Sequence, residues 1–367
     1  MKSKVVFSML GLGVALAMLP LRLSAQALGE GIENKRIGTA AATELLIPVG
    51  ARDLAMGGAS LATSAGIDAL HWNPAGLGRI ASTAEGTFTT MSYLADIRLN
   101  YGAVGVNFGG FGVVGLSVRS FDFGDILLTT NDDPEGRAGR TFAPAFVTVG
   151  LTYSRAFTDA ITAGGTIKLI SEKMGRASGN GMALDLGVQY HTLAGIKGLH
   201  LGVAMKNIGP QMSFGGSGLL RRATSSEGSR PEQYYEIKPA SFELPSSVEI
   251  GLAYERTMSE NFTVNVSGAF ANNNLGLDGY RGGAEALYQV SNNLRLAGRA
   301  GIELSPNGGI DDSATKISSG GDDQIFGPTL GFGFMYKTES VDITLDYAYR
   351  SVDFFDSNQM FTLKLGF

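Results

Sequence analysis

The gaps between the predicted β-strands of this chain alternate between long and short from about residue 93 to the C-terminus. The strands themselves show period-two alternation of apolar with polar or small residues, as in Val341 to Arg350 and Phe361 to Phe367. A barrel threaded through a bilayer keeps tight turns on one side, while the loops on the other side are free to grow. A soluble β-sandwich has no reason to keep such a rule. The alternation therefore favours an all-β fold of one kind, a transmembrane antiparallel β-barrel.

The pattern predicts about fourteen strands, and an even number places both chain ends on the periplasmic side. The strands are expected at 85–93, 97–108, 111–121, 147–156, 161–171, 181–191, 199–207, 246–256, 262–270, 282–290, 293–303, 328–337, 340–350 and 359–367. The longer, external loops are expected at 122–145, 172–180, 208–245, 271–281, 304–327 and 351–358. The periplasmic turns are expected at 109–110, 157–160, 257–261, 291–292 and 338–339, with a longer one at 192–198.

Charged side chains of both signs lie on the polar face of these strands, which in a barrel faces the lumen. They are Lys168, Asp185, Glu249, Glu255, Arg295, Arg299, Asp342, Asp346, Arg350 and Lys364. The mixture of signs favours a polar wall that pairs with a plug over a selectivity ring, which carries one sign. A lined path for a polar solute is the alternative.

Aromatic residues gather where the strands that run toward the periplasm end, as expected of an interfacial belt. This rim comprises Phe108, Tyr153, Tyr190, Tyr254, Tyr288, Tyr336 and Phe367. The general preference of Tyr and Phe for strands does not explain why they gather at one end. Phe367, which closes an alternating strand, also resembles the C-terminal signal of barrel assembly.

Composition excludes several functional classes. The chain has no cysteine, which removes disulfides, thiol catalysis and cysteine metal sites. His71, His191 and His200 are too scattered for a metal cluster, and no motif joins one to a nucleophile. The acidic pairs Asp132-Asp133, Asp311-Asp312 and Asp322-Asp323 lack the spacing of a calcium loop. A net charge of −5 argues against a nucleic-acid partner. We therefore expect no catalytic, cofactor or metal site and no enzymatic activity.

Residues 1–27 have the pattern of a secretory signal peptide. Lys2 and Lys4 precede an apolar stretch, Val5 to Leu19, and the small-residue exit Ala25-Gln26-Ala27 follows. An N-terminal membrane anchor is the alternative, but the apolar stretch is short for a spanning helix. An exported chain with barrel strands is expected in the outer membrane of a Gram-negative bacterium, in contact with its lipid.

Residues 28–84 do not alternate and are expected to be partly helical. Thr39 to Leu46 is predicted as a helix, Pro48 interrupts it, and Ala51 to Met56 is a second helix ended by Gly57-Gly58. A barrel of about fourteen strands is too wide for its own side chains to fill. The interpretation is a lumenal plug at 28–84 and the barrel at 85–367. A periplasmic tail without a lumenal role is the alternative.

Two motifs in the plug segment, LLIPVGARDLAMGGA at 45–59 and ALHWNPAGL at 69–77, resemble the PorV/PorQ family. That family is similar in architecture to the FadL fatty-acid transporters, which carry a related Asn-Pro-Ala element. Asp53 departs from the uncharged residue that members often have. The resemblance rests on Pro48, Gly50, Arg52, Met56, Gly57, Gly58, Trp72, Asn73, Pro74 and Gly76. It implies an outer-membrane protein of the type IX secretion system, which holds or shuttles secreted cargo beside a translocon barrel and a surface peptidase.

The longest expected loop, 208–245, mixes aromatic, aliphatic and basic residues as protein interfaces do. Its partner-contact candidates are Phe214, Leu219, Arg221, Arg222, Tyr234, Tyr235 and Phe242. A lid folded over the barrel mouth is the alternative. The expected function is non-enzymatic docking of secreted cargo proteins. The alternative is a FadL-like transporter of hydrophobic small molecules, which needs an apolar lumenal pocket and a lateral opening. A passive porin is a third, which a plug contradicts.

Overall fold

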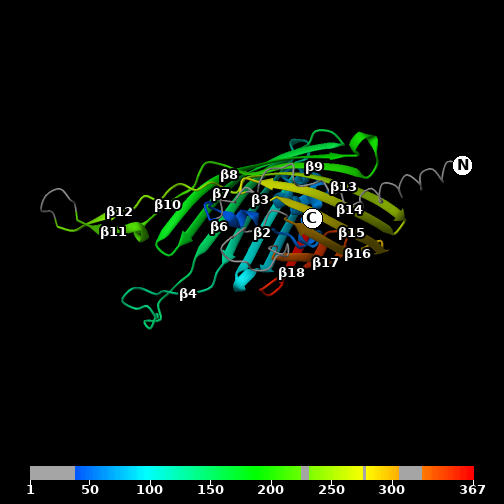
Figure 1. Ribbon diagram of the computed structural model, residues 1–367. Helices are drawn as coiled ribbons and strands as arrows, with labels where there is room; N and C mark the ends of the chain where they lie inside the picture. Colours follow the sequence, from blue (N-terminus) through cyan, green and yellow to red (C-terminus); the bar gives the residue numbers. More distant parts are fainter. Residues whose placement is uncertain (1–37, 225–230, 276–277, 306–324) are drawn as a thin grey trace, which may run out of the picture. The chain divides into compact units, whose positions relative to one another are not determined.

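The computed structural model describes residues 38–224, 231–275, 278–305 and 325–367. The expected signal peptide, the first ten residues of the expected plug, and the pairs Asp311-Asp312 and Asp322-Asp323 lie outside the described residues. Fourteen of the described strands form a closed antiparallel barrel, which confirms the predicted fold class. Figure 1 shows these strands side by side, and the first and last close the ring through the register Glu85↔Gly366 to Ser92↔Gln359.

The barrel strands correspond one to one with the fourteen predicted segments. They are β1 (Ala84–Ser92), β2 (Arg98–Asn107), β3 (Val113–Asp122), β6 (Ala145–Ala156), β7 (Ile161–Met174), β8 (Ala177–His191), β9 (Leu199–Ile208), β13 (Ser247–Ser259), β14 (Phe262–Asn273), β15 (Gly279–Ser291), β16 (Leu294–Leu304), β17 (Phe326–Lys337), β18 (Asp342–Val352) and β19 (Asn358–Gly366). The connections 108–112, 157–160, 192–198, 260–261, 292–293 and 338–341 lie at one end, called here the short-turn end. The opposite end is the loop end.

Three of the expected loops differ from the prediction. Residues 172–180 were expected to form a long loop, but β7 and β8 extend their pairing to Met174↔Ala177 and leave a two-residue turn. Gly175 has a φ of +59°, and the left-handed conformation that glycine tolerates lets the hairpin close there. The long loops 122–145 and 208–245 instead carry short strands: β4 (Ile126–Leu127), β5 (Thr141–Phe142), β10 (Ser213–Gly215), β11 (Leu220–Ala223) and β12 (Gln233–Glu236).

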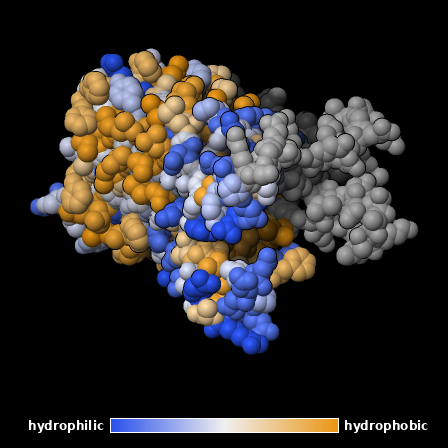
Figure 2. All heavy atoms as spheres, turned by 90° about the vertical axis from the view of Figure 1, so that its left-hand side faces the viewer, coloured by the Kyte–Doolittle hydropathy of each residue, from blue (hydrophilic) through white to orange (hydrophobic). Residues whose placement is uncertain are grey.

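The barrel wall is apolar outside and polar inside, the reverse of a soluble protein. From Met182 to Gln189 in β8, exposed and buried residues alternate. Met182, Leu184, Leu186 and Val188 are exposed, whereas Asp185 and Gln189 are among the buried residues. Figure 2 shows broad hydrophobic areas, in orange on the left of the view, beside a hydrophilic region. Such an outer face is stable only against lipid tails, because exposed apolar area is unfavourable in water.

Most of the charged residues predicted to face the lumen are buried in it. Lys168, Asp185, Glu249, Arg299, Asp346 and Arg350 are all less than a tenth exposed. Glu255 and Arg295, close to the short-turn ends of β13 and β16, are exposed instead.

Across the described ranges, no helix is both long and apolar enough to cross a bilayer.

Within the described residues before the barrel, 38–83, the chain folds into six short helices that pack against the inner wall. They are η2 (Thr43–Leu46), α2 (Ala51–Ala55), η3 (Ser60–Ala62), η4 (Gly66–Asp68), α3 (Ala69–Trp72) and η5 (Pro74–Arg79). The helix expected from Thr39 begins only at Thr43, because Ala40 pairs with Glu243 and Ala42 has a φ of +54°. We call residues 40–80 the plug; α2 contacts β16 to β19, η3 contacts β9, β13 and β14, and η5 contacts β3 and β6 to β8.

Inward-facing glycines in the wall allow the plug to approach the strand backbones. A Cβ added at Gly187 would lie 2.0 Å from Asn73 Oδ1, and one at Gly283 would lie 2.3 Å from the Met56 carbonyl oxygen. A Cβ at Gly301 would lie 2.2 Å from the backbone nitrogen of Gly57. Real Cβ atoms do not come this close to other atoms, so each contact requires a residue without a side chain.

We predict that Gly301→Ala destabilises the assembled barrel by about 3 kcal/mol, because the added methyl overlaps plug backbone that cannot move aside. The matched control is Gly298→Ala on the same strand, where an added Cβ has no atom within 4 Å. Urea unfolding in lipid vesicles, followed by β-sheet circular dichroism, measures both variants. Equal stability of the two variants would contradict this packing.

Candidate functional site: a cavity at the loop end

A cavity of about 640 Å³ lies between the plug and the loop ends of the strands. Plug residues from Thr43 to Pro48, with Leu54, Gly57 and Gly58, form its floor together with His71 and Trp72. Residues near the loop ends of β3, β6, β9 and β13 to β18 form its walls, together with Tyr93 and Ile97 from the β1–β2 loop. The volume is in the range of small-molecule sites.

One wall of the cavity is aromatic. Phe123 packs edge to face with Phe146, with ring centroids 4.8 Å apart, and lies 6.3 Å from Phe121. Tyr93 and Phe326 lie 6.2 Å apart. These rings continue into the plug core, where Ile47, Tyr93, Ile97, Phe123 and Phe146 pack against buried residues. This wall suits an apolar or aromatic ligand.

The neighbouring wall, to which β9, β13, β15 and β16 contribute, is charged, and most of its charges are paired with each other. Lys206 Nζ lies 3.1 Å from Glu249 Oε1, and Arg281 Nη1 lies 3.2 Å from Glu249 Oε2. Arg281 Nε donates to Glu303 Oε1 at 2.8 Å. The Lys206 ammonium also lies 5.4 Å from the centre of the Trp72 ring. Because these charges neutralise one another, this wall does not by itself select an ion of either sign.

Glu44, in the floor, is a buried acid with an unpaired oxygen. Its side chain is 5% exposed, and Oε1 has no hydrogen-bond partner. Burial and the neighbouring Glu172 carboxylate raise the pKa of Glu44 to about 8. Glu172 Oε1 accepts from the Ala42 backbone N–H at 2.8 Å, so the two carboxyls meet where the plug contacts β7. Repulsion between two buried carboxylates favours the protonated form of one of them.

The residues of the two sequence motifs hold the plug in place. Trp72 Nε1 donates to the Val49 carbonyl at 2.9 Å and joins the two motifs. Asn73 is fully buried; Oδ1 accepts from Ala75 N–H, while Nδ2 donates to carbonyls of Leu61 in the plug and Val188 in β8. Of the other motif residues, Pro48, Gly57 and Gly58 line the cavity, and Met56 is fully buried. Gly50 and Gly57 have positive φ. Pro74 begins η5, and Gly76 packs against the Ser64 carbonyl.

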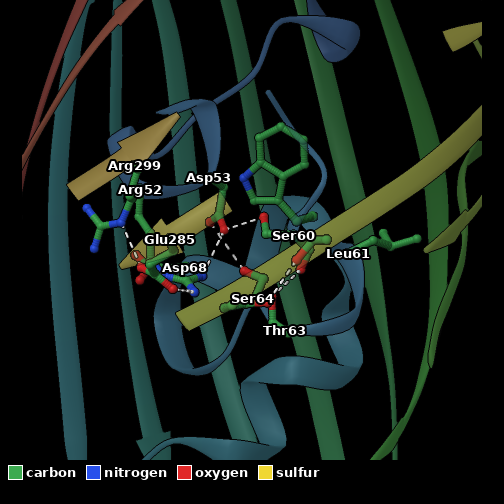
Figure 3. A network of polar contacts seen from close by, with 12 residues as sticks. Arg52, Asp53, Ser60, Leu61, Thr63, Ser64, Asp68, Glu285 and Arg299 are labelled. Carbon is green, nitrogen blue, oxygen red and sulfur yellow. Dashed lines mark hydrogen bonds and ion pairs between the residues drawn. The ribbon is translucent and has the colours of Figure 1, made fainter. Parts of the chain in front are cut away.

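A buried ionic network joins the plug to the wall, as Figure 3 shows. Arg52 in α2 binds Glu285 in β15 at 2.8 Å, and Arg299 in β16 links Glu285 to Asp346 in β18. Asp53 accepts from Ser60 Oγ at 2.5 Å and from Arg52. Burial raises the pKa of Asp53 to about 6, although Arg52 opposes this. Asp53, the charged residue at which this chain departs from the PorV/PorQ pattern, therefore has its partners, Arg52 and Ser60, within the plug.

The rim and loop residues predicted from the sequence fall into distinct places. The rim aromatics all lie close to the short-turn end, and each is exposed except Tyr190, which is half-buried. In the long loop, Phe214 and Phe242 pack together with ring centroids 5.8 Å apart, against a cluster that includes Ala42 and Leu45 of the plug. Arg221, Arg222, Tyr234 and Tyr235 lie on the exposed β11–β12 hairpin, and half-buried Leu219 precedes it.

Sequence reasoning missed the cavity and most of its lining. Phe121 and Phe123 are two residues apart at the end of β3, so their side chains point to the same face of the strand. This spacing was the one sequence pattern that could have indicated an aromatic lining there. Tyr93 and Phe326 are far apart in the sequence, and no sequence pattern relates them.

His191 and His200 meet across the β8–β9 pair, with Nδ1 atoms 2.9 Å apart, and Arg79 contacts His191. Among the described residues, no group of three acidic or histidine side chains could hold a metal ion.

Comparison with known proteins shows the fold. No protein-family model matches the chain, and no curated protein matches it. The Pseudomonas putida toluene transporter TodX has a TM-score of 0.51 at 15% sequence identity, over 86% of this chain and 96% of that chain. The monoaromatic hydrocarbon channel CymD has a TM-score of 0.50 at 15% identity, over 87% and 97% of the two chains. These structures do not bear on the PorV/PorQ resemblance, which stays a prediction.

We predict that Glu44→Gln removes a pH-dependent loss of stability. The pKa of Glu44 is raised from 4.5 to about 8 in the folded protein, so the folded state holds this proton more tightly than the unfolded chain. The contribution of Glu44 to stability is therefore full below pH 4.5 and falls as the pH rises to about 8. The free energy of unfolding in vesicles, measured at intervals across this range, should decline less for Glu44→Gln than for the wild type. Parallel pH profiles would contradict the assignment.

Proposed function

We propose that this chain is an outer-membrane barrel that takes up small apolar molecules through the cavity at its loop end. The observation that carries the proposal is the aromatic wall of Tyr93, Phe121, Phe123, Phe146 and Phe326 above a plug. A site of this size and lining buries most of a small apolar ligand, which supplies the binding free energy. The fold shared with TodX supports the proposal, since that protein is described as a toluene transporter. No catalytic step is proposed.

A pairing irregularity in the wall beside the cavity is the candidate exit. The register between β8 and β9 shifts between Leu184↔Ile208 and Leu186↔Met205, and Asn207 within the shift has a φ of +57°. Asn207 also lines the cavity, and its Oδ1 accepts from Lys168 Nζ at 2.8 Å. Strand bulges interrupt the ladder of hydrogen bonds between neighbouring strands, so we propose this shift as the place where the wall opens.

We predict that toluene binds the detergent-solubilised protein and changes the fluorescence of Trp72, the single tryptophan of the chain, which lines the cavity. Phe123→Ala should weaken binding by about three- to tenfold, because an aromatic contact is lost. Phe332→Ala, on the exposed outer wall, is the matched control and should bind as the wild type does. Uptake of labelled toluene by cells expressing each variant tests passage. Absence of any fluorescence response or uptake would refute the proposal.

A second candidate function, docking of secreted cargo as in the PorV/PorQ family, is supported by the β11–β12 hairpin. All eight residues of its two strands are exposed, including Leu220, Tyr234 and Tyr235. Arg222 lies over the Tyr234 ring at 5.3 Å, and aromatic residues beside arginine are common in protein interfaces. The partners would be secreted cargo, a translocon barrel or a surface peptidase.

We predict that replacing 220–236 with a short Gly-Ser linker leaves the barrel assembled but abolishes capture of such partners from solubilised outer membranes. The linker is short because the Ile237 N–H already bonds to the Leu219 carbonyl at the base of the hairpin. Phe214 and Phe242 remain, so their packing against the plug is not disturbed. Partner capture is measured by pull-down with mass spectrometry. Unchanged recovery of the same partners would end this second proposal.

A further inference from the structure

Arg350, near the loop end of β18, lines the cavity without an anionic partner. The residue is 4% exposed, and its Nε and Nη2 are buried without a hydrogen-bond partner. Among the residues that the structure describes, Arg350 forms neither an ion pair nor a hydrogen bond through its guanidinium. The other cations lining the cavity, Lys206 and Arg281, both pair with carboxylates.

The position of Arg350 is set by a bulge in the neighbouring strand. Thr329 pairs with Arg350, and the register between β17 and β18 then shifts before Phe326 pairs with Val352. This brings the Phe326 ring 3.7 Å from the guanidinium carbon. Bulges commonly re-aim a side chain in this way. The ring contact orients the guanidinium and offsets part of its desolvation, but the Phe326 ring has no lone pair to accept a hydrogen bond from the guanidinium N–H groups.

A buried guanidinium with unpaired donors is costly unless an acceptor is supplied. A carboxylate suits it best, because two carboxylate oxygens match the arginine fork. Glu303, the cavity carboxylate from the neighbouring wall, already accepts from Arg281. No carboxylate that the structure describes in this cavity bonds to Arg350. A ligand that carries an acceptor would satisfy these donors, while its remaining surface meets the Tyr93 and Phe326 rings.

We propose that Arg350 is a specificity residue that binds an acidic group, so that the cavity takes a compact organic anion with an apolar or aromatic body. This inference rests on the proposed function, in which the cavity is the uptake site. It adds the charge of the ligand, which the aromatic wall alone does not determine. A neutral hydrocarbon would fill the apolar wall but leave the guanidinium donors unpaired.

The test compares three probes with one apolar body: para-tert-butylbenzoate, its methyl ester and tert-butylbenzene. Isothermal titration calorimetry on the full chain in detergent, at neutral pH, gives the three affinities. We expect the anion to bind the wild-type protein at least about tenfold more tightly than either neutral probe, since charge-assisted hydrogen bonds are strong. Arg350→Met should reduce this preference to about onefold. Arg295→Met, an exposed position outside the cavity, should keep it.

Two results separate failure of this inference from failure of the proposed function. If tert-butylbenzene binds but the anion binds no more tightly than the ester, or if the preference survives Arg350→Met, Arg350 is not the anion site while the uptake proposal stands. If none of the three probes binds, both fail. Should Arg350→Met not assemble, the wild-type comparison of anion with ester decides, and equal affinities overturn the inference.

Discussion

The close contact between plug backbone and wall glycines is the constraint on which the rest of the structure depends. A fourteen-stranded ring encloses more space than its own side chains fill, and in this chain the plug occupies part of that space. The plug can do so at this depth only because Gly187, Gly283 and Gly301 present no side chain to it. Their positions hold the plug against the wall, and the plug in turn forms the floor of the loop-end cavity.

Ionic contacts and glycine packing hold the plug in different ways. Packing excludes other positions by steric overlap, whereas Arg52 and Glu285 attach α2 to the wall through charges buried from water. Removing one partner of such a pair leaves a buried, unpaired charge, so an arrangement in which Arg52 and Glu285 are separated is disfavoured. The wall accordingly combines an outer surface matched to lipid with an inner surface matched to one particular segment of the same chain.

The sequence was sufficient for the strands and insufficient for the site. Alternation in segments such as Met182 to Tyr190 has one physical cause, a lipid face opposed to a lumenal face, and it therefore predicted the strands and their order. The hairpin at Gly175 was missed because pairing beyond the apolar stretch leaves no periodic signal. The cavity could not be predicted because Tyr93 and Phe326 meet only when the ring closes, and the bulge that places Phe326 over Arg350 has no local sequence pattern.

The central claim, that the plug lies against the inner face of the wall, is tested most directly by a disulfide in this cysteine-free chain. A Cβ at Gly251 would lie 3.0 Å from Leu61 Cβ, about 0.5 Å short of the range found in disulfides, so a small shift of the plug lets the bridge form. We expect the double variant Leu61→Cys with Gly251→Cys to form an intramolecular bridge under oxidising conditions in the assembled barrel. Leu61→Cys with Gly298→Cys, whose second cysteine faces outward, should not. A barrel that assembles fully while the first pair stays reduced would contradict the account.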